Sequence, residues 1–182
     1  MRKLLLAAFG ALTLVAPAAL AQAPKADPAN TLVIELKSGT VLVQLRPDLA
    51  PKHVERVKSL AKQGFYNGLK FHRVINGFMA QTGDPKGTGQ GGSSLGDLPA
   101  EFTPEPYRRG TIGAARTQNP NSANSQFFIC FNDTGCKSLV GNYTVFGKVT
   151  SGMEVVDKIK KGDRAKGGAV QNPDTIVKMY VQ

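Results

Sequence analysis

The sequence has little of the chemistry on which metal sites and covalent catalysis depend. It contains two cysteines and two histidines among 182 residues. Cys130 and Cys136 lie near each other, whereas His53 and His72 are distant from them, which is a poor set of ligands for zinc. No serine is accompanied by an obvious base in a nucleophile elbow, the strand-to-helix turn of many hydrolases. We therefore expect no metal, no cofactor and no hydrolytic triad.

Beyond its N-terminus the sequence also lacks an apolar run long enough to cross a bilayer, which takes roughly 20 residues. The N-terminus itself has two basic residues, an apolar run to Val15, and Pro17, which arrives too early for a spanning helix. A-x-A patterns follow at 19–21 and 21–23. This layout predicts a signal peptide over residues 1–21, with cleavage after residue 23 as the alternative. We expect an exported protein, periplasmic in a Gram-negative source, without stable membrane insertion.

The rest of the chain divides into a short lead and one domain. Residues 22–30 are rich in Ala and Pro and predict a flexible lead, while residues 31–182 suffice for one domain with a hydrophobic core. The 23 basic residues, less the two in the signal peptide, exceed the 13 acidic residues by eight. Because the lysines are dispersed without interleaved aromatic residues, we expect a solvated basic face, no nucleic-acid binding, and a monomer.

Short β-rich runs dominate the domain, and two helices are predicted, from Pro51 to Gly64 and over 153–161. His53 is expected to be exposed on the basic side of the first helix. Many short strands with two helices predict a closed or nearly closed antiparallel barrel. The predicted strands are 31–35, 41–45, 71–75, 78–82, 111–115, 126–131, 144–149 and 174–181.

A glycine-rich stretch at 87–92 formally matches the G-x-G-x-x-G pattern of dinucleotide sites. Such a site needs a strand directly before the glycines and a helix directly after them. Here a Gly-Asp-Pro sequence precedes the stretch, and residues 93–99 show no helical pattern. We interpret the stretch as a loop held close to neighbouring backbone.

The most informative segment begins at Phe71, where an arginine stands among aromatic residues. Strand alternation predicts that Phe71, Arg73 and Ile75 share one face. The Asn-Gly pair that follows predicts a turn, after which Gln81 can return beside Arg73. A second group of polar and aromatic residues lies at 121–129. Taken alone, these patterns fit an aromatic core that the arginine merely caps.

Four motifs occur in order along the domain: FHRVIxGFMxQ at 71–81, GTGxGG at 87–92, NSxxSQFFI at 121–129 and YTVFGKV at 143–149. With these motifs the chain strongly resembles the cyclophilins, over about residues 31 to 181. The segments around Glu101 and Ala115 look like the bacterial, exported branch of that family. The resemblance implies a closed eight-stranded antiparallel barrel capped by two α-helices. It also implies a peptidyl-prolyl cis-trans isomerase that acts on proline-containing polypeptides and accelerates the folding of exported proteins.

The resemblance also implies a role for individual residues, with Arg73 as the catalytic arginine. A second set is implied to contact the substrate around it. Phe78, Met79, Phe128 and Leu139 would line the proline pocket, Gln81, Ala115, Arg116 and Gln126 would hold the substrate backbone, and the ring of Tyr143 would cover the pocket.

The segment 131–140 departs from the family pattern. Relatives often carry an aromatic residue just before the leucine matched by Leu139, whereas this sequence has Ser138 there and a small insertion that contains Cys136. An oxidising compartment would permit a disulfide between Cys130 and Cys136, and the sequence leaves this pairing open.

Two functions other than catalysis also remain open at this point. The domain could hold proline-containing segments as a chaperone without essential turnover, using the same pocket. It could also act as an assembly factor whose basic face binds an acidic partner in a salt-sensitive way.

Overall fold

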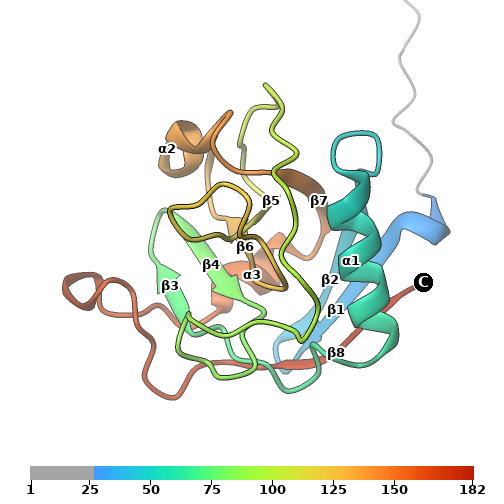
Figure 1. Ribbon diagram of the computed structural model, residues 1–182. Helices are drawn as coiled ribbons and strands as arrows, with labels where there is room; N and C mark the ends of the chain where they lie inside the picture. Colours follow the sequence, from blue (N-terminus) through green and yellow to red (C-terminus); the bar gives the residue numbers. More distant parts are fainter. Residues whose placement is uncertain (1–26) are drawn as a thin grey trace, which may run out of the picture.

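The computed structural model describes residues 27–182, and within them eight antiparallel strands form one curled sheet, a half-barrel (Figure 1). All eight predicted strands are present, with shifted ends. Their order across the sheet is β3-β4-β6-β5-β7-β2-β1-β8. The strands are β1 (Thr31–Leu36), β2 (Gly39–Leu45), β3 (Arg73–Ile75), β4 (Met79–Thr82), β5 (Thr111–Ala114), β6 (Phe127–Cys130), β7 (Val145–Ser151) and β8 (Ile176–Val181).

The sheet is open, so the prediction of a closed barrel is wrong. β3 and β8 are its two edges, and no ladder joins them. β3 has three residues, and the chain before β8 contributes isolated bridges alone, Lys70 with Thr175 and Arg73 with Ala169. Too few consecutive residues face each other across this gap to form a continuous ladder of hydrogen bonds.

Both predicted helices are present, as α1 (Pro51–Lys62) and α3 (Met153–Lys158), and a four-residue helix α2 (Asp133–Cys136) was not predicted. α1 packs against β7 and β8, and α3 packs against β2. The capping of a barrel by these helices stays a prediction. The described residues also contain three short 3-10 helices, which are η1 (Pro28–Asn30), η2 (Lys137–Leu139) and η3 (Arg164–Lys166).

The prediction that His53 is exposed is wrong, because this side chain is 4% exposed. Its Nδ1 lies 2.6 Å from a carboxylate oxygen of Glu101. The same carboxylate accepts hydrogen bonds from the backbone N–H groups of Lys52 and His53, each at 3.1 Å. Glu101 therefore caps the N-terminus of α1, whose own N-cap residue, Ala50, has no side chain that could do so.

Buried apolar side chains form one large core and one smaller core. Phe71 belongs to the large core, whereas Ile75 packs against the small one, so the prediction that these two side chains share a face is wrong. The reason is that β3 begins at Arg73, and strand alternation does not extend back to Phe71. The small core consists of Met79, Tyr107, Phe128, Cys130, Cys136 and Val145.

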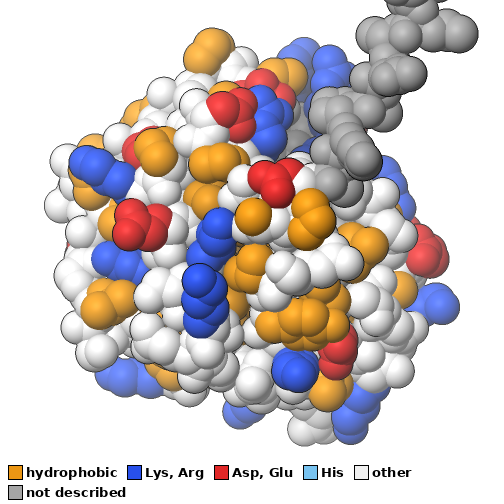
Figure 2. Space-filling model, turned by 90° about the vertical axis from the view of Figure 1, so that its right-hand side faces the viewer, with side chains coloured by type: hydrophobic (Ala, Val, Ile, Leu, Met, Phe, Trp, Pro, Cys, Tyr) orange, Lys and Arg blue, Asp and Glu red, His pale blue; other side chains and the backbone are white. Residues whose placement is uncertain are grey.

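The predicted signal peptide lies outside the described residues. Of the predicted lead, the last residues are described, and they form η1, where the carboxylate of Asp27 accepts a hydrogen bond from the N–H of Ala29. Within residues 27–182, no helix is long and apolar enough to cross a membrane. On the face drawn in Figure 2, basic side chains are scattered among acidic and hydrophobic ones rather than gathered into one patch.

Candidate active site

Three neighbouring strands place the central residues of the site in one row. Arg73 of β3 pairs with Gln81 of β4, and Gln81 pairs in turn with Phe128 of β6. Paired residues of antiparallel strands point to the same face, so these three side chains lie side by side. The turn between β3 and β4 falls where the Asn-Gly pair predicts it, which is why the sequence could place Gln81 beside Arg73.

A cavity of about 140 Å³ lies over this row. It is small, which suits a single ring rather than a large ligand. Nine of the ten predicted site residues line it, and Gln126 lines a neighbouring groove instead. We call this cavity the Arg73 pocket, and its lining residues are Arg73, Phe78, Met79, Gln81, Ala115, Arg116, Phe128, Leu139 and Tyr143.

The guanidinium of Arg73 is held by two neutral acceptors. Its Nε–H donates to the carbonyl oxygen of Gly167 at 3.0 Å, and Nη1 donates to the side-chain oxygen of Gln81 at 3.1 Å. Among the described residues, Nη2 has no hydrogen-bond partner, and no carboxylate forms a salt bridge with this arginine. Arg73 thus borders the pocket with its orientation fixed and donor capacity left over.

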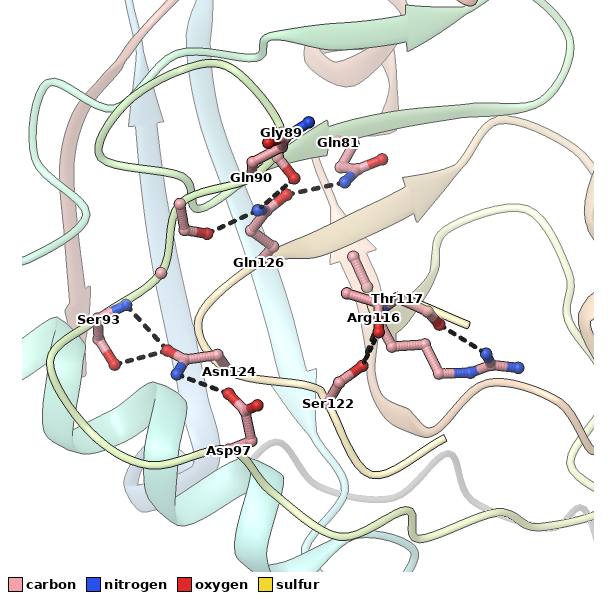
Figure 3. A pocket seen from close by; sticks show the side chains of 13 residues that line it. Gln81, Gly89, Gln90, Ser93, Asp97, Arg116, Thr117, Ser122, Asn124 and Gln126 are labelled. Carbon is pink, nitrogen blue, oxygen red and sulfur yellow. Dashed lines mark hydrogen bonds between the residues drawn. The ribbon is translucent and has the colours of Figure 1, made fainter. Parts of the chain in front are cut away.

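A relay of amides fixes Gln81 in turn. Its Nε2 donates to the side-chain oxygen of Gln126 at 2.9 Å (Figure 3). The Nε2 of Gln126 donates to the carbonyl oxygens of Gly89 and Gly91, at 3.0 and 2.7 Å. Because each amide both accepts and donates, neither can flip without losing a hydrogen bond. The orientation of Arg73 is therefore tied to the glycine-rich loop.

The Phe128 ring forms the apolar floor of the pocket. It stacks on Tyr107 with ring centroids 5.9 Å apart and meets the edge of Tyr143 at 5.8 Å. Its neighbour in β5 is Gly113, where an added Cβ would lie 2.5 Å from the Phe128 ring. Glycine at this position is what allows the ring to lie flat against the sheet.

The guanidinium of Arg116 donates to backbone carbonyls of other residues. Nε and Nη2 donate to the carbonyl oxygen of Asn142, at 3.0 and 2.8 Å, and Nη1 donates to that of Thr117 at 2.8 Å. The guanidinium carbon also lies 4.5 Å from the centroid of the Tyr143 ring. These contacts fix the wall of the pocket at Tyr143 and leave little of Arg116 to hold a substrate.

A second hollow of about 320 Å³ adjoins the pocket and shares three of its lining residues, Gln81, Ala115 and Arg116 (Figure 3). We call it the groove. Its far wall is held by Asn124, whose side-chain oxygen accepts from the N–H and hydroxyl of Ser93 at 2.9 and 2.7 Å. Asn124 lies in the predicted 121–129 segment, where the sequence indicates no role for it. Its pattern alone does not reveal a partner 31 positions away.

The glycine-rich loop is held by side chains, so the prediction that it lies close to neighbouring backbone is wrong in this respect. The Asp84 carboxylate accepts hydrogen bonds from the N–H groups of Lys86, Thr88 and Gly89. Burial raises the pKa of Asp84, but hydrogen bonds from backbone N–H groups of the loop outweigh this effect, and the pKa lies below its usual value. At Gly91 an added Cβ would clash with this carboxylate.

A pattern typical of hydrolases overlaps the end of the loop, but the structure around it does not form a nucleophile elbow. Residues 92–96 read G-x-S-x-G around Ser94, yet no strand precedes them and no helix follows. His72 lies beneath the loop and is 8% exposed, and burial lowers its pKa despite the nearby Asp84. In the described part of the chain, no three His, Cys, Asp or Glu side chains gather in a metal-binding cluster.

Comparisons with known proteins agree with this geometry. The family model described as cyclophilin type peptidyl-prolyl cis-trans isomerase/CLD matches residues 31–181. A probable peptidyl-prolyl cis-trans isomerase from Brucella suis is 56% identical over 97% of this chain and 93% of its own length. A peptidyl-prolyl cis-trans isomerase from Helicobacter pylori is 45% identical over 71% of this chain and 80% of its own.

Solved structures show the same likeness. A Cryptosporidium parvum cyclophilin type peptidyl-prolyl cis-trans isomerase, crystallised in the presence of the dipeptide Ala-Pro, has a TM-score of 0.75 and 30% identity. The match covers 84% of this chain and 98% of that one. The cyclophilin AquaCyp293 from Hirschia baltica has a TM-score of 0.74 and 26% identity, over 85% of this chain and 74% of that chain. The chain belongs to the family of cyclophilin type peptidyl-prolyl cis-trans isomerases.

Proposed function

We propose that this isomerase acts on proline-containing segments of exported proteins, and that it does so in the Arg73 pocket with Arg73 as the catalytic residue. The observation that carries the proposal is the position of the Arg73 guanidinium and the set of hydrogen bonds it makes. It borders a small cavity with an apolar floor, is oriented by two neutral acceptors, and keeps Nη2 without a partner among the described residues.

The reaction to be accelerated is a rotation about the peptide bond that precedes proline. Its barrier is about 18–20 kcal/mol because rotation breaks the amide resonance. No covalent bond has to break, so neither a nucleophile nor a base is needed. Catalysis requires that the twisted amide be bound more tightly than either planar form.

Arginine suits this task because of what rotation does to the proline nitrogen. In the planar amide the nitrogen lone pair is delocalised and accepts hydrogen bonds poorly, whereas in the twisted amide it is localised. A guanidinium stays charged and offers several donors in a rigid plane. A preorganised donor of this kind typically contributes about 3–4 kcal/mol to the transition state. In our proposal Nη2 or Nη1 of Arg73 supplies that donor.

The rest of the pocket would hold the proline ring while the preceding residue rotates. Phe128 and Met79 are almost fully buried and provide a firm apolar floor. Leu139 and Tyr143 close the opposite side. The groove, with Gln126 on its wall, would take the chain before the proline, and Arg116 would shape the wall rather than contact the substrate.

A refolding assay distinguishes catalysis from binding alone. It uses a protein whose slow refolding step is prolyl isomerisation. A catalytic amount of the wild-type protein should accelerate the slow phase in proportion to its concentration. Arg73→Ala should lose this acceleration by about two to three orders of magnitude, since one preorganised donor is removed. Arg73→Lys should recover little, because an ammonium lacks the planar fork. Equal acceleration by folded Arg73→Ala would contradict the assignment, and improved yield only at stoichiometric amounts would favour the chaperone alternative.

Export to the periplasm is the second part of the proposal. Its support is the N-terminal sequence pattern together with a disulfide between Cys130 and Cys136, since disulfides persist in oxidising compartments. In a Gram-negative host the full-length chain should appear in the periplasmic fraction shortened by 21 or 23 residues. A chain that starts at residue 24 should stay in the cytoplasm. Retention of the full-length chain in the cytoplasm would overturn this part, and light scattering would test the expected monomer.

A further inference from the structure

One wall of the Arg73 pocket is built by a segment with little regular structure. We call residues 131–143 the rim segment, and it supplies Leu139 and Tyr143 to the pocket. It contains α2 and η2, with four and three residues. Helices this short are not stable by themselves. The position of the wall therefore depends on what the rim segment is attached to.

A disulfide attaches the rim segment to the sheet directly beneath the pocket. Cys136 is the last residue of α2, and it is bonded to Cys130, the last residue of β6. Cys130 pairs with Met79 in the ladder, and both cysteines are fully buried in the small core that also contains Met79 and Phe128. The disulfide thus joins the wall of the pocket to its floor, three residues before Leu139.

Close packing and hydrogen bonds complete the attachment. Gly135 lies so near the turn before β4 that an added Cβ would be 2.0 Å from the carbonyl oxygen of Gly77. The side-chain amide of Asn132 donates to the same oxygen at 3.0 Å. Beyond the disulfide, the carbonyl of Leu139 accepts hydrogen bonds from the N–H groups of Asn142 and Tyr143. The disulfide, α2 and both pocket residues therefore move as one unit.

We propose that the Cys130–Cys136 disulfide is a positioning element for the Arg73 pocket, which sets the affinity for the proline ring and leaves the rate of rotation to Arg73. This rests on the proposed function. Without the bond, no covalent link holds the end of α2 to the end of β6. β6 is held by ladders to β4 and β5 on its two sides, whereas α2 has four residues. It is α2 that gives way, and it carries Leu139 away from the floor.

The test is steady-state kinetics on a short Xaa-Pro peptide with Cys130→Ala/Cys136→Ala. We expect KM to rise about tenfold, the effect of losing most of one apolar side-chain contact, and kcat to stay within about twofold. Amide hydrogen exchange should quicken across residues 131–143 while β4 and β6 remain protected. An unchanged KM in a folded variant, or a fall in kcat without a rise in KM, would overturn the proposal.

A second variant covers the case in which the double substitution prevents folding. Gly135→Ala keeps the disulfide but pushes α2 away from Gly77, and it should raise KM in the same direction. Gly96→Ala is the matched control, because an added Cβ there meets nothing within 4 Å, and its KM should equal that of the wild type. A wild-type protein without isomerase activity would instead refute the proposed function. An active wild type with an unaltered KM in the folded disulfide variant, or in Gly135→Ala if that variant does not fold, refutes the positioning role alone.

Discussion

At the scale of single residues, the site depends on neutral groups that orient a charge without neutralising it. Gly167 and Gln81 accept hydrogen bonds from Arg73 through uncharged oxygens. A carboxylate in either place would form an ion pair that competes with the substrate for the same donors. The amide relay from Gln126 to Gln81 therefore acts on the geometry of Arg73 and not on its charge.

Gln126→Ala should lower kcat about three- to tenfold, the worth of one hydrogen bond that positions a catalytic group. KM should also rise, because Gln126 lines the groove proposed to hold the chain before the proline, so the fall in kcat is the diagnostic result. Peptide isomerisation measured over a range of substrate concentrations separates the two parameters. Gln171→Ala, an exposed position, serves as the control. A rise in KM at constant kcat would show that Gln126 binds substrate and does not position Arg73.

Phe128→Ala should lower the free energy of unfolding by about 3–5 kcal/mol, since the ring is 4% exposed and packs between Tyr107 and Tyr143. It should also raise KM, because the floor of the pocket is lost. Urea unfolding and peptide kinetics measure the two effects. Phe102→Ala, at 39% exposure, should cost far less stability. Equal losses in the two variants would mean that Phe128 is not a packed floor.

How much of the site could be predicted differs from residue to residue. Arg73 and Gln81 lie in one hairpin, so alternation and a turn signal suffice to bring them together. Asn124 and the carbonyls of Gly89 and Gly91 gain their roles from partners far along the chain, which no local pattern reveals. The burial of His53 does have a local signal, since His53 precedes the buried Val57 by one helical turn.

At the scale of elements, α1 is capped by a side chain from a distant loop. Glu101 lies 49 residues after Lys52, and its carboxylate accepts a hydrogen bond from the backbone N–H of Lys52. Burial raises the pKa of Glu101, yet hydrogen bonds from His53 and the two backbone N–H groups lower it more, so the carboxylate is favoured. The helix is amphipathic by its own sequence, but its N-terminus is satisfied only in the folded protein.

Glu101→Gln should reduce the free energy of unfolding by about 1–2 kcal/mol, because the amide oxygen replaces a charged acceptor for two N–H groups. Thermal melts monitored by circular dichroism would show it. Glu154→Gln, in the first turn of α3, removes the same charge where no side chain caps the helix, and it is expected to cost less. A melting temperature that is unchanged by Glu101→Gln would contradict the capping role.

The element that the sequence did not predict is α2, and this failure has a physical cause. A helix of four residues spans little more than one turn, so it leaves no periodic pattern of apolar residues. Its position is set by the disulfide and by Gly135 against the backbone. The open edge between β3 and β8 was not predicted for a similar reason. Strand propensity indicates which residues form strands, but not how many of them pair with a neighbouring strand.

At the scale of the whole molecule, two buried histidines and two hydrogen-bonded carboxylates change stability with pH in the same direction. Burial lowers the pKa of His53 and of His72, so the fold favours their neutral forms. The pKa values of Glu101 and Asp84 also lie below their usual range, because hydrogen bonds to the carboxylates outweigh burial. Each group whose pKa is lower in the folded protein stabilises the fold at pH values above its unfolded-state pKa. This contribution is lost as the pH falls through the folded-state pKa.

Stability should therefore be constant near pH 7 to 8 and fall below about pH 6.5, first through the histidines and, below about pH 4, through the carboxylates. Urea unfolding at a series of pH values tests this expectation. His53→Gln should remove part of the loss between about pH 6.5 and pH 5. A free energy of unfolding that stays level down to pH 4 would contradict the assignment of these buried groups.

The central claim is that Arg73 stabilises the twisted amide and not the bound ground state. NMR exchange spectroscopy on an Xaa-Pro peptide, titrated with wild type and with Arg73→Ala, reports both the affinity and the cis–trans rate on the enzyme. We predict that Arg73→Ala changes Kd by less than about threefold, while the rate on the enzyme falls about 100- to 1000-fold. An unchanged rate, or a loss of activity explained entirely by weaker binding, would contradict the account.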